Sequence, residues 1–325
     1  MTCIPTSPPL VAPLAQDETR PLWSVMIPVY NCSQFLQETL ESVLTQDIPE
    51  QQMQIEVVDD ASTDTNVEAM VYRIGKGRIK YFRQEHNVGS LTNFKTCINR
   101  SKGRLIHLLH GDDRVNLGYY QKIEELFSLY PEAGAAFCRY RCINEEGQKV
   151  YDKSPEMKKD GILQNWLLTI GERQRIQYAA ITVRREVYEK LGAFYGIEYG
   201  EDWEMWVRIA RNYPVAYSPA ILADYRKHTM SISSNKYLSG EYLQDLHRAM
   251  MLIQQHLPEE KKKTTLQKSR RYYARYGIQI AEQLWHKLHN RQIANTQIDH
   301  ALSLYRSPII YWMILRLHLQ FFLNR

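Results

Sequence analysis

The fold is decided by the stretch Leu-Ile-His-Leu-Leu-His-Gly-Asp-Asp-Arg-Val, residues 105–115. Its apolar first half is typical of a buried strand, which ends at Gly111 and two adjacent carboxylates, Asp112 and Asp113. Apolar side chains cannot solvate two charges, so these carboxylates must contact water, a counter-charge or a metal ion. Because Asp and Gly also close strands for backbone reasons alone, the pair taken by itself favours a simple turn.

A second strand that ends in acids makes a metal or ligand site more favoured than a simple turn. The strand predicted at residues 54–58 is followed by Asp59 and Asp60, and strands alternate with helices on both sides of it. This alternation predicts a parallel sheet with right-handed crossovers. The carboxyl ends of parallel strands meet at one edge, where ligands bind in open α/β sheets. The two acidic strand ends together therefore favour a metal or ligand site over two unrelated turns.

Hydrophobic periodicity predicts elements along the whole chain. Predicted strands lie at Trp23–Val29, 54–58, 78–83, 105–110, 134–142, 178–183 and 215–218. Predicted helices lie up to Leu44 and at 91–99, 117–130 and Arg185–Leu191, and two more begin near Asp64 and Asp202. From about Gly240 onward only helices are predicted, at 242–257, 263–288, 292–305 and Pro308–Leu323.

Composition places the chain among ordinary globular proteins. Its 325 residues are enough for about two domains, and 44% hydrophobic with 24% charged residues is the usual balance. Residues 1–21 hold five prolines and no periodic pattern, which predicts a disordered leader without the apolar core of a signal peptide. The five cysteines, odd in number and without a secretory leader, predict free thiols and a cytoplasmic location.

The net charge of +5 is concentrated near the C-terminus. Residues 241–325 contain 13 Lys and Arg against 6 Asp and Glu, a net of +7, whereas residues 1–240 have 28 against 30. A basic helical region suits an anionic membrane surface, although a solvated helix face is the commoner explanation. The apolar run 309–315 is too short for a membrane span, which needs ~20 residues. We expect a packed or interfacial terminal helix, peripheral membrane contact at most, and no nucleic-acid partner.

Five motifs stand in the order in which they occur in one enzyme family. They are Ile27-Pro28-Val29-Tyr30-Asn31, Val57-Val58-Asp59-Asp60-Ala61-Ser62-Thr63-Asp64, Asn87-Val88-Gly89, Gly111-Asp112-Asp113 and Glu201-Asp202-Trp203. Any one of them alone is a weak signal. The ordered set, spread over residues 23–233, resembles the family 2 glycosyltransferases, which are inverting enzymes of the GT-A fold.

The resemblance implies the fold class and the order of domains. It implies an α/β protein of the GT-A type, Rossmann-like, with a mostly parallel mixed sheet flanked by helices and an all-α C-terminal extension. The glycosyltransferase domain would span residues 22–236, with a nucleotide half at about 22–115 and an acceptor half at about 116–236. Residues 237–325 would form the helical C-terminal region.

The resemblance also assigns residues to a donor site. It implies that the nucleotide-sugar is contacted by Pro28, Val29, Tyr30, Asp60, Asn87 and Asp112. It implies that Asp113 binds Mn²⁺ or Mg²⁺ at the diphosphate, with His228 as a second ligand. Many members carry an additional Asp before these acids, where this chain has His110. The expected metal site therefore has fewer carboxylates than is usual in the family.

The acceptor side of the site is expected to come from the acidic motif at residues 201–203. By resemblance Asp202 matches the general base and Glu201 is its acidic neighbour, whose charge would raise the proton affinity of Asp202. Trp203 and Tyr199 are the aromatic side chains that we expect to stack on the acceptor sugar.

The expected chemistry explains why these residue types are needed. The leaving diphosphate gains negative charge, which a hard dication bound by carboxylate oxygens stabilises. The acceptor hydroxyl loses a proton as it attacks, and a positioned carboxylate such as Asp202 can take it. We expect transfer of a hexose from a nucleotide diphosphate sugar, with UDP as the first choice, to a hydroxyl of a glycan or lipid-linked acceptor. Such a reaction belongs to polysaccharide biosynthesis at the cytoplasmic face of a membrane.

Two other functions fit part of the pattern. A nucleotidyltransferase would also bind a nucleotide and a metal, but it usually carries a Gly-rich loop with Lys or Arg near the first strand, and none follows Val29. A non-catalytic nucleotide-sugar-binding or scaffold protein would not need both Asp113 and Asp202. A dinucleotide-binding dehydrogenase does not fit, because no Gly-x-Gly-x-x-Gly follows the first strand.

Overall fold

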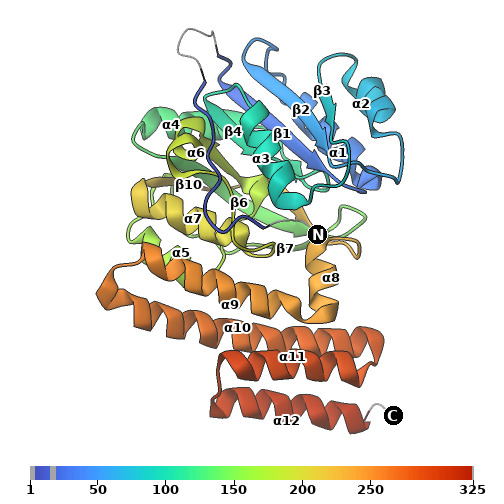
Figure 1. Cartoon of the computed structure of the whole chain (residues 1–325), viewed down its shortest axis with the longest axis vertical. Helices are drawn as coiled ribbons and strands as arrows, with labels where there is room; N and C mark the ends of the chain where they lie inside the picture. The colour runs from blue at the N-terminus through green and yellow to red at the C-terminus, as the bar shows by residue number, and fades with distance from the viewer. Residues whose placement is uncertain (1–3, 15–19, 324–325) are drawn as a thin grey trace. The chain divides into compact units, whose positions relative to one another are not determined.

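The computed structural model describes residues 4–14 and 20–323, without the side chains of 322 and 323. The chain forms two compact units, and Figure 1 labels most of their helices and strands. The first unit comprises Met1–Trp166, Ile176–Glu198 and Arg208–Lys227. The second unit comprises Leu167–Arg175, Tyr199–Val207 and His228–Arg325.

This division differs from the single boundary expected between residues 236 and 237. Two segments from the middle of the chain belong to the second unit, because their apolar side chains pack within it. The indole N–H of Trp203 donates to the carbonyl of Ile170 at 2.6 Å, and its ring lies 5.3 Å from that of Tyr273. Helices α5 (Trp166–Glu172) and α7 (Glu201–Asn212) contribute residues to both units.

One mixed sheet organises the first unit. In the described part of the chain this sheet has ten strands. Eight of them are neighbours in the order β3-β2-β1-β4-β9-β6-β10-β5, and the other two are β7, which pairs with β6, and β8, which pairs with β10. The strands are β1 (Trp23–Val29), β2 (Met53–Asp59), β3 (Lys80–Arg83), β4 (Leu105–Leu108), β5 (Arg114–Val115), β6 (Ala135–Ile143), β7 (Lys149–Asp152), β8 (Gly161–Ile162), β9 (Ile181–Arg184) and β10 (Val215–Arg226).

The strands that carry the predicted donor site are parallel. β1 pairs in parallel with β2 on one side and with β4 on the other, and β3 extends this parallel part beyond β2. β9 runs antiparallel to β4 and to β6, which makes the sheet mixed and confirms the predicted α/β class. All seven residues of β1 are buried, as expected for a continuous apolar strand in a parallel sheet. The acidic ends of β2 and β4 therefore flank the end of β1.

Helices cover this sheet and fix the loops at its carboxyl edge. They are α1 (Ser33–Leu44), α2 (Val67–Gly75), α3 (Ser90–Arg100), α4 (Tyr119–Leu129) and α6 (Arg185–Leu191), with a 3₁₀ turn at η1 (Tyr178–Ala180). In α1 the apolar side chains fall at helical spacing, so that Leu36, Leu40 and Val43 are buried in one core cluster with β1.

The N-terminal segment differs from the disordered leader that composition predicts. Within residues 4–14 the carbonyls of Pro5 and Pro9 accept hydrogen bonds from the N–H groups of Gly196 and Ala193, both at 2.8 Å. Val11 is buried. Proline lacks an N–H but keeps a carbonyl acceptor, so a proline-rich segment can still accept hydrogen bonds from another segment of the same chain. Residues 1–3 and 15–19 lie outside the described residues.

The second unit is helical from residue 232 onward. Its helices are α8 (Ile232–Ser239), α9 (Glu241–Ile253), η2 (Gln254–His256), α10 (Glu259–Leu288), α11 (Arg291–Leu304) and α12 (Pro308–Leu323). The four predicted helices are present, and α8 is an addition to them. No helix in the described part of the chain is both long and apolar enough to cross a membrane.

Candidate active site

The acidic turn, residues 110–113, follows directly after β4. The N–H of Gly111 donates to the carbonyl of Pro28 at 3.2 Å, which ties the turn to the end of β1. A Cβ atom on Gly111 would lie 2.9 Å from Cys32 Sγ and 2.9 Å from Val29 Cγ2. Only glycine allows this close approach, so Gly111 lets the acidic turn lie directly against the end of β1.

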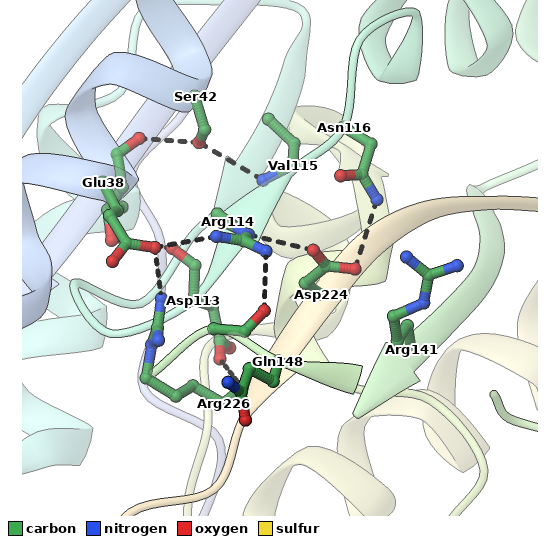
Figure 2. A network of polar contacts seen from close by, with 12 residues as sticks. Glu38, Ser42, Asp113, Arg114, Val115, Asn116, Arg141, Gln148, Asp224 and Arg226 are labelled. Atoms are coloured by element: carbon green, nitrogen blue, oxygen red, sulfur yellow. Dashed lines mark hydrogen bonds and ion pairs between the residues drawn. The ribbon is translucent and has the colours of Figure 1, made fainter. Parts of the chain in front are cut away.

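The end of β10 holds Asp113 in place (Figure 2). The Asp113 carboxylate accepts a hydrogen bond from the N–H of Arg226 at 2.8 Å, and the Nε of Arg226 donates to the Asp112 carbonyl at 2.9 Å. From α1, the Thr39 hydroxyl donates to the Asp113 carbonyl at 2.7 Å. Both backbone and side chain of Asp113 are thus fixed by segments distant in sequence.

Arg226 and Arg114 share one carboxylate, that of Glu38 on α1 (Figure 2). The guanidinium of Arg226 lies 2.7 Å from Glu38, that of Arg114 lies 2.8 Å from it, and Arg114 also lies 2.9 Å from Asp224. Partial burial raises the pKa of Glu38, but the two guanidinium groups outweigh it and hold the pKa below its usual range. The network therefore keeps the Arg226 side chain, which is 1% exposed, in a single orientation.

Three side chains of the acidic turn fit a metal ion. His110, Asp112 and Asp113 each offer one ligand atom, and these atoms all lie within 4.8 Å of one another. The Nε2 of His110 is buried without a hydrogen-bond partner among the described residues, and the imidazole stacks 4.3 Å from the ring of Tyr178. Burial lowers the pKa of His110, which favours the neutral imidazole that a metal requires. Two carboxylates and one imidazole are a suitable donor set for Mn²⁺ and an acceptable one for Mg²⁺.

Burial also makes the ionised form of Asp113 costly. It raises the pKa of Asp113 well above its usual range, the charge of Asp112 adds to this, and the hydrogen bond from Arg226 opposes it. A bound dication would act in the opposite direction, because it favours the charged carboxylate. The turn is therefore an arrangement whose charge a cation would balance.

The two acids after β2 have different surroundings. The Asp59 carboxylate accepts hydrogen bonds from the Ser62 N–H at 2.9 Å, the Tyr81 hydroxyl at 2.7 Å and the Arg83 guanidinium at 2.5 Å. These bonds occupy both of its oxygens, so Asp59 stabilises the local structure. Asp60 is the acid of this pair that faces the next loop of the sheet edge.

Asp60 connects β2 with the Asn87-Val88-Gly89 motif. Its buried carboxylate accepts hydrogen bonds from the N–H of Val88 at 2.7 Å and of Gly89 at 3.0 Å. Burial raises the pKa of Asp60, and these two hydrogen bonds partly oppose it. Its predicted contact with the base or ribose stays a prediction.

The predicted donor-site residues lie at one edge of the first unit. Pro28 and Val29 end β1, and Tyr30, the next residue, is half exposed. The exposed Asn87 belongs to the loop that Asp60 holds. The acidic turn follows β4, the other neighbour of β1. The strand ends that carry these residues thus share one edge of the sheet, and their role in donor binding stays a prediction.

In the second unit Asp202 occupies the first turn of α7. Its carboxylate accepts a hydrogen bond from the Trp203 N–H at 2.7 Å and another from the side-chain amide of Gln174. Burial raises the pKa of Asp202 to about 7, and both hydrogen bonds oppose that rise. The cause is burial, not the like-charge repulsion that we expected from the buried Glu201. A carboxylate with this pKa can accept or release a proton near neutral pH.

The expected aromatic acceptor contacts have different outcomes. Trp203 is fully buried, its N–H is bonded to Ile170 and its ring packs on Tyr273, so the structure contradicts its role in sugar stacking. It lies on the apolar face of α7, where the side chain packs in the core. The Tyr199 hydroxyl lies 3.0 Å from that of Tyr237. The role of Tyr199 stays a prediction.

His228 begins the C-terminal segment of the second unit. Its carbonyl accepts hydrogen bonds from the hydroxyls of Ser231, at 3.1 Å, and Ser234, at 2.7 Å, at the start of α8. Asp113 belongs to the first unit and both His228 and Asp202 belong to the second. The metal-ligand role of His228 and the convergence of the two acids on one cleft stay predictions.

Three residues of these sites carried no functional assignment from sequence. Arg226 fixes the acidic turn, Gln174 donates to Asp202, and His110 completes a three-residue donor set. His110 was visible as a departure from the family pattern and could have been proposed as a ligand. Arg226 and Gln174 belong to no motif, so only the fold reveals them.

Sequence comparison identifies the family. The profile of Glycosyl transferase family 2 matches residues 24–192, just over half of the chain. The putative teichuronic acid biosynthesis glycosyltransferase TuaG of Bacillus subtilis is 28% identical over 227 residues, which cover 68% of this chain and 85% of that protein. The uncharacterized glycosyltransferase RT0329 of Rickettsia typhi is 24% identical over 220 residues, covering 66% of this chain and 67% of that protein.

Solved structures show the same fold at low sequence identity. TarS 1–349 of S. aureus, in complex with UDP-GlcNAc, has a TM-score of 0.63 at 16% identity, covering 86% of this chain and 79% of the TarS 1–349 chain. The mannosyltransferase PcManGT from Pyrobaculum calidifontis, in complex with GDP-Man and Mn²⁺, has a TM-score of 0.59 at 17% identity, covering 96% and 83%. Because the family model covers more than half of its length, the chain belongs to glycosyltransferase family 2 and is a nucleotide-sugar glycosyltransferase.

Proposed function

We propose that the protein transfers a hexose, with inversion and with a divalent metal, from a nucleotide diphosphate sugar to a hydroxyl group. The observation that carries the proposal is the acidic turn, in which His110, Asp112 and Asp113 present ligand atoms within 4.8 Å of one another. This group follows β4 and lies at the same edge of the sheet as the end of β1 and the loop held by Asp60. A diphosphate at this edge would meet the metal ligands and the nucleotide contacts together.

The acidic turn would bind Mn²⁺ or Mg²⁺ through Asp113, Asp112 and His110. When bound, the dication supplies a positive charge that stabilises the departing diphosphate without proton transfer. Arg226 keeps the Asp113 carboxylate and the Asp112 backbone in the orientation that such binding needs. No acid is then required to protonate the leaving group, in contrast to glycoside hydrolases.

Asp202 would act as the general base. Its pKa of about 7 lets it take the proton of the acceptor hydroxyl while that oxygen attacks the anomeric carbon. Gln174 and the first turn of α7 fix the carboxylate, so the base is held in one direction. A single attack from the face opposite the diphosphate inverts the anomeric configuration.

A UDP-sugar is the first candidate for the donor. The structural neighbour TarS was solved with UDP-GlcNAc and PcManGT with GDP-Man, so both bases are represented on this fold. For the acceptor we propose a glycan or a lipid-linked sugar at the cytoplasmic face of a membrane. The relative TuaG is named for teichuronic acid biosynthesis, and the basic C-terminal helices of this chain suit a membrane-side location.

A donor panel tests the proposal. The full chain is incubated with UDP-, GDP-, dTDP- and CDP-sugars, with Mn²⁺, with Mg²⁺ or with EDTA, and the released nucleotide is measured. We expect release of a nucleoside diphosphate that requires metal and is lost in Asp113→Ala. The exposed acid Asp299 supplies the control variant Asp299→Ala, which should behave as wild type. Release of a sugar 1-phosphate, with the nucleoside monophosphate transferred, would instead show a nucleotidyltransferase, and no released nucleotide with any donor would show a non-catalytic protein.

A further inference from the structure

Helix α12 is apolar on both of its faces. Its packed face, buried within the helical unit, is formed by Ile310, Ile314, Leu317 and Phe321. Its outer face carries five large apolar side chains that are 47% to 60% exposed, namely Ile309, Tyr311, Trp312, Leu315 and Leu319. A helix that is apolar all round normally lies in a protein core or against a membrane. Among the residues that the structure describes, α12 has a protein partner for the packed face alone.

Charge on the outer face is small and basic. Arg316 is the charged residue there, where it forms an ion pair with Glu282 at 2.8 Å and lies 5.7 Å from the Trp312 ring. From residue 300 to the last residue the sequence has no Asp or Glu, but three Arg and two His. The ion pair balances the charge of Arg316, but the helical region as a whole, residues 241–325, has a net charge of +7, which complements a negatively charged surface.

We propose that the outer face of α12 binds an anionic membrane surface. Trp and Tyr beside aliphatic side chains are the composition of helices that lie at the boundary of headgroups and acyl chains. The packed face is held by the rest of the unit, where the Phe321 ring lies 4.5 Å from that of Trp285. The helix therefore lies along the membrane with one side in the headgroup layer.

A second copy of the chain is the less suitable occupant. Five half-exposed side chains offer roughly 500 Å² of apolar surface, since a large aromatic buries about 150–250 Å². A standard protein interface needs about 800 Å² of total surface from each partner, so a dimer would need contacts beyond this strip. A lipid surface needs no complementary shape, so a narrow apolar strip is sufficient for it.

This inference rests on the membrane-side location in the proposed function and names the element responsible. The full chain is floated with vesicles of phosphatidylcholine, alone or mixed with phosphatidylglycerol. We expect flotation with the mixed vesicles that weakens as salt is raised. The double variant Trp312→Ser, Leu315→Ser should bind roughly tenfold more weakly, because it removes two of the five apolar contacts.

The matched control is the double variant Tyr72→Ser, Leu117→Ser, which changes two exposed apolar side chains outside α12. Circular dichroism confirms that each variant is folded, and the control should float as wild type does. Donor hydrolysis without vesicles, measured on the same samples, should be equal in wild type and in the α12 variant. If hydrolysis is absent in every sample the transferase proposal fails, while the flotation result still stands.

Two outcomes would overturn the membrane assignment. One is wild-type protein that does not float with mixed vesicles, or an α12 variant that floats equally well. The other is a dimer in analytical ultracentrifugation that the α12 variant dissociates while no vesicle binding is seen. That second result would assign the outer face to self-association.

Discussion

Asp113 and Asp202 are both carboxylates whose pKa burial raises, but the groups around them differ in kind. Asp113 lies in a turn with a second acid, Asp112, and accepts a hydrogen bond from the backbone of Arg226. Asp202 has neutral hydrogen-bond donors, the Gln174 amide and the Trp203 N–H. The comparison shows that a bound cation would favour the ionised form of Asp113, whereas Asp202 can exchange a proton near pH 7 without one.

The ion-pair network beside the acidic turn is close to electrically neutral. Its two arginines, Arg114 and Arg226, are matched by the two carboxylates of Glu38 and Asp224 (Figure 2). The two positive and two negative charges cancel within the network. The network thus provides orientation, and a dication bound at the acidic turn would add positive charge beside Asp112 and Asp113.

The largest expected effect is that of Asp202→Asn. Removing the base should lower kcat by about 10²–10⁴-fold, because the acceptor hydroxyl then loses its proton without help. Donor affinity, measured by calorimetry, should stay within a factor of two, since the residues proposed for donor binding belong to the first unit. Glu201→Gln is the control. If that variant lost more activity than Asp202→Asn, the neighbouring acid would be the base.

Asp113→Asn tests whether the acidic turn binds the metal. The variant keeps the shape of the side chain but removes one negative ligand, so we expect metal-dependent donor binding to weaken by roughly 10²-fold. Calorimetric titration with a UDP-sugar in Mn²⁺ and in EDTA measures this directly. Equal affinities of wild type and variant in Mn²⁺ would place the metal elsewhere.

Arg226→Ala tests orientation rather than charge. Loss of the buried guanidinium should lower stability by about 2–3 kcal/mol, because hydrogen bonds to the Asp112, Asn144 and Glu145 carbonyls and to Glu38 are lost. Donor affinity should fall about tenfold as the acidic turn loses its fixed position.

Arg141→Ala is the matched control for this arginine. Arg141 also lies on the sheet, but it is partly exposed and pairs with Asp152 at 2.9 Å. Loss of that surface pair should cost less than about 1 kcal/mol. Thermal melts and calorimetry compare the two variants. An Arg226→Ala protein with wild-type donor affinity would contradict the positioning role.

The smallest expected effect is on pH dependence. Since the pKa of Asp202 is about 7, kcat should rise as pH increases through 7 and then level off. In Gln174→Leu the midpoint should move upward, because the amide hydrogen bond stabilises the ionised form. A pH–rate profile of both proteins checks this, and an unchanged midpoint would remove Gln174 from the site.

The free energy of unfolding should also depend on the ionisation of Asp202, but it should fall as pH rises, whereas kcat should increase. A carboxyl whose pKa is higher in the folded than in the unfolded protein binds more protons when folded, so stability falls as pH rises between the two values. Asp202 should therefore destabilise the fold as pH rises from about 4 to about 7. Asp202→Asn should lose this part of the dependence, which denaturant melts at several pH values would show.

Local sequence signals were sufficient for the long elements. β1 has the predicted bounds because a continuous apolar segment ends there, and α12 begins at Pro308 as proline at a first helical position predicts. The two-residue strands β5 and β8 were not predicted, since such short segments have no periodicity. They exist because β10 pairs with them.

β10 shows how a missed element hides a site residue. The prediction ended at Ser218, because Pro219 cannot donate to a neighbouring strand. In the structure the strand continues to Arg226, and the register shifts between Ser218 and Ile221, which accommodates the proline. The donor-site motifs could be predicted from their strand ends. The residue that positions Asp113 could not, because it depends on this irregular pairing.

The contact between Arg226 and Asp113 also has a consequence for synthesis of the chain. Arg226 lies 113 positions after Asp113, and Asp224 lies 110 positions after its partner Arg114. Since a chain leaves the ribosome from its N-terminus, β1, β2 and β4 emerge and can pair while β10 is still untranslated. A translation product that stops before β10 therefore contains the acidic turn but none of the residues of β10 that fix it.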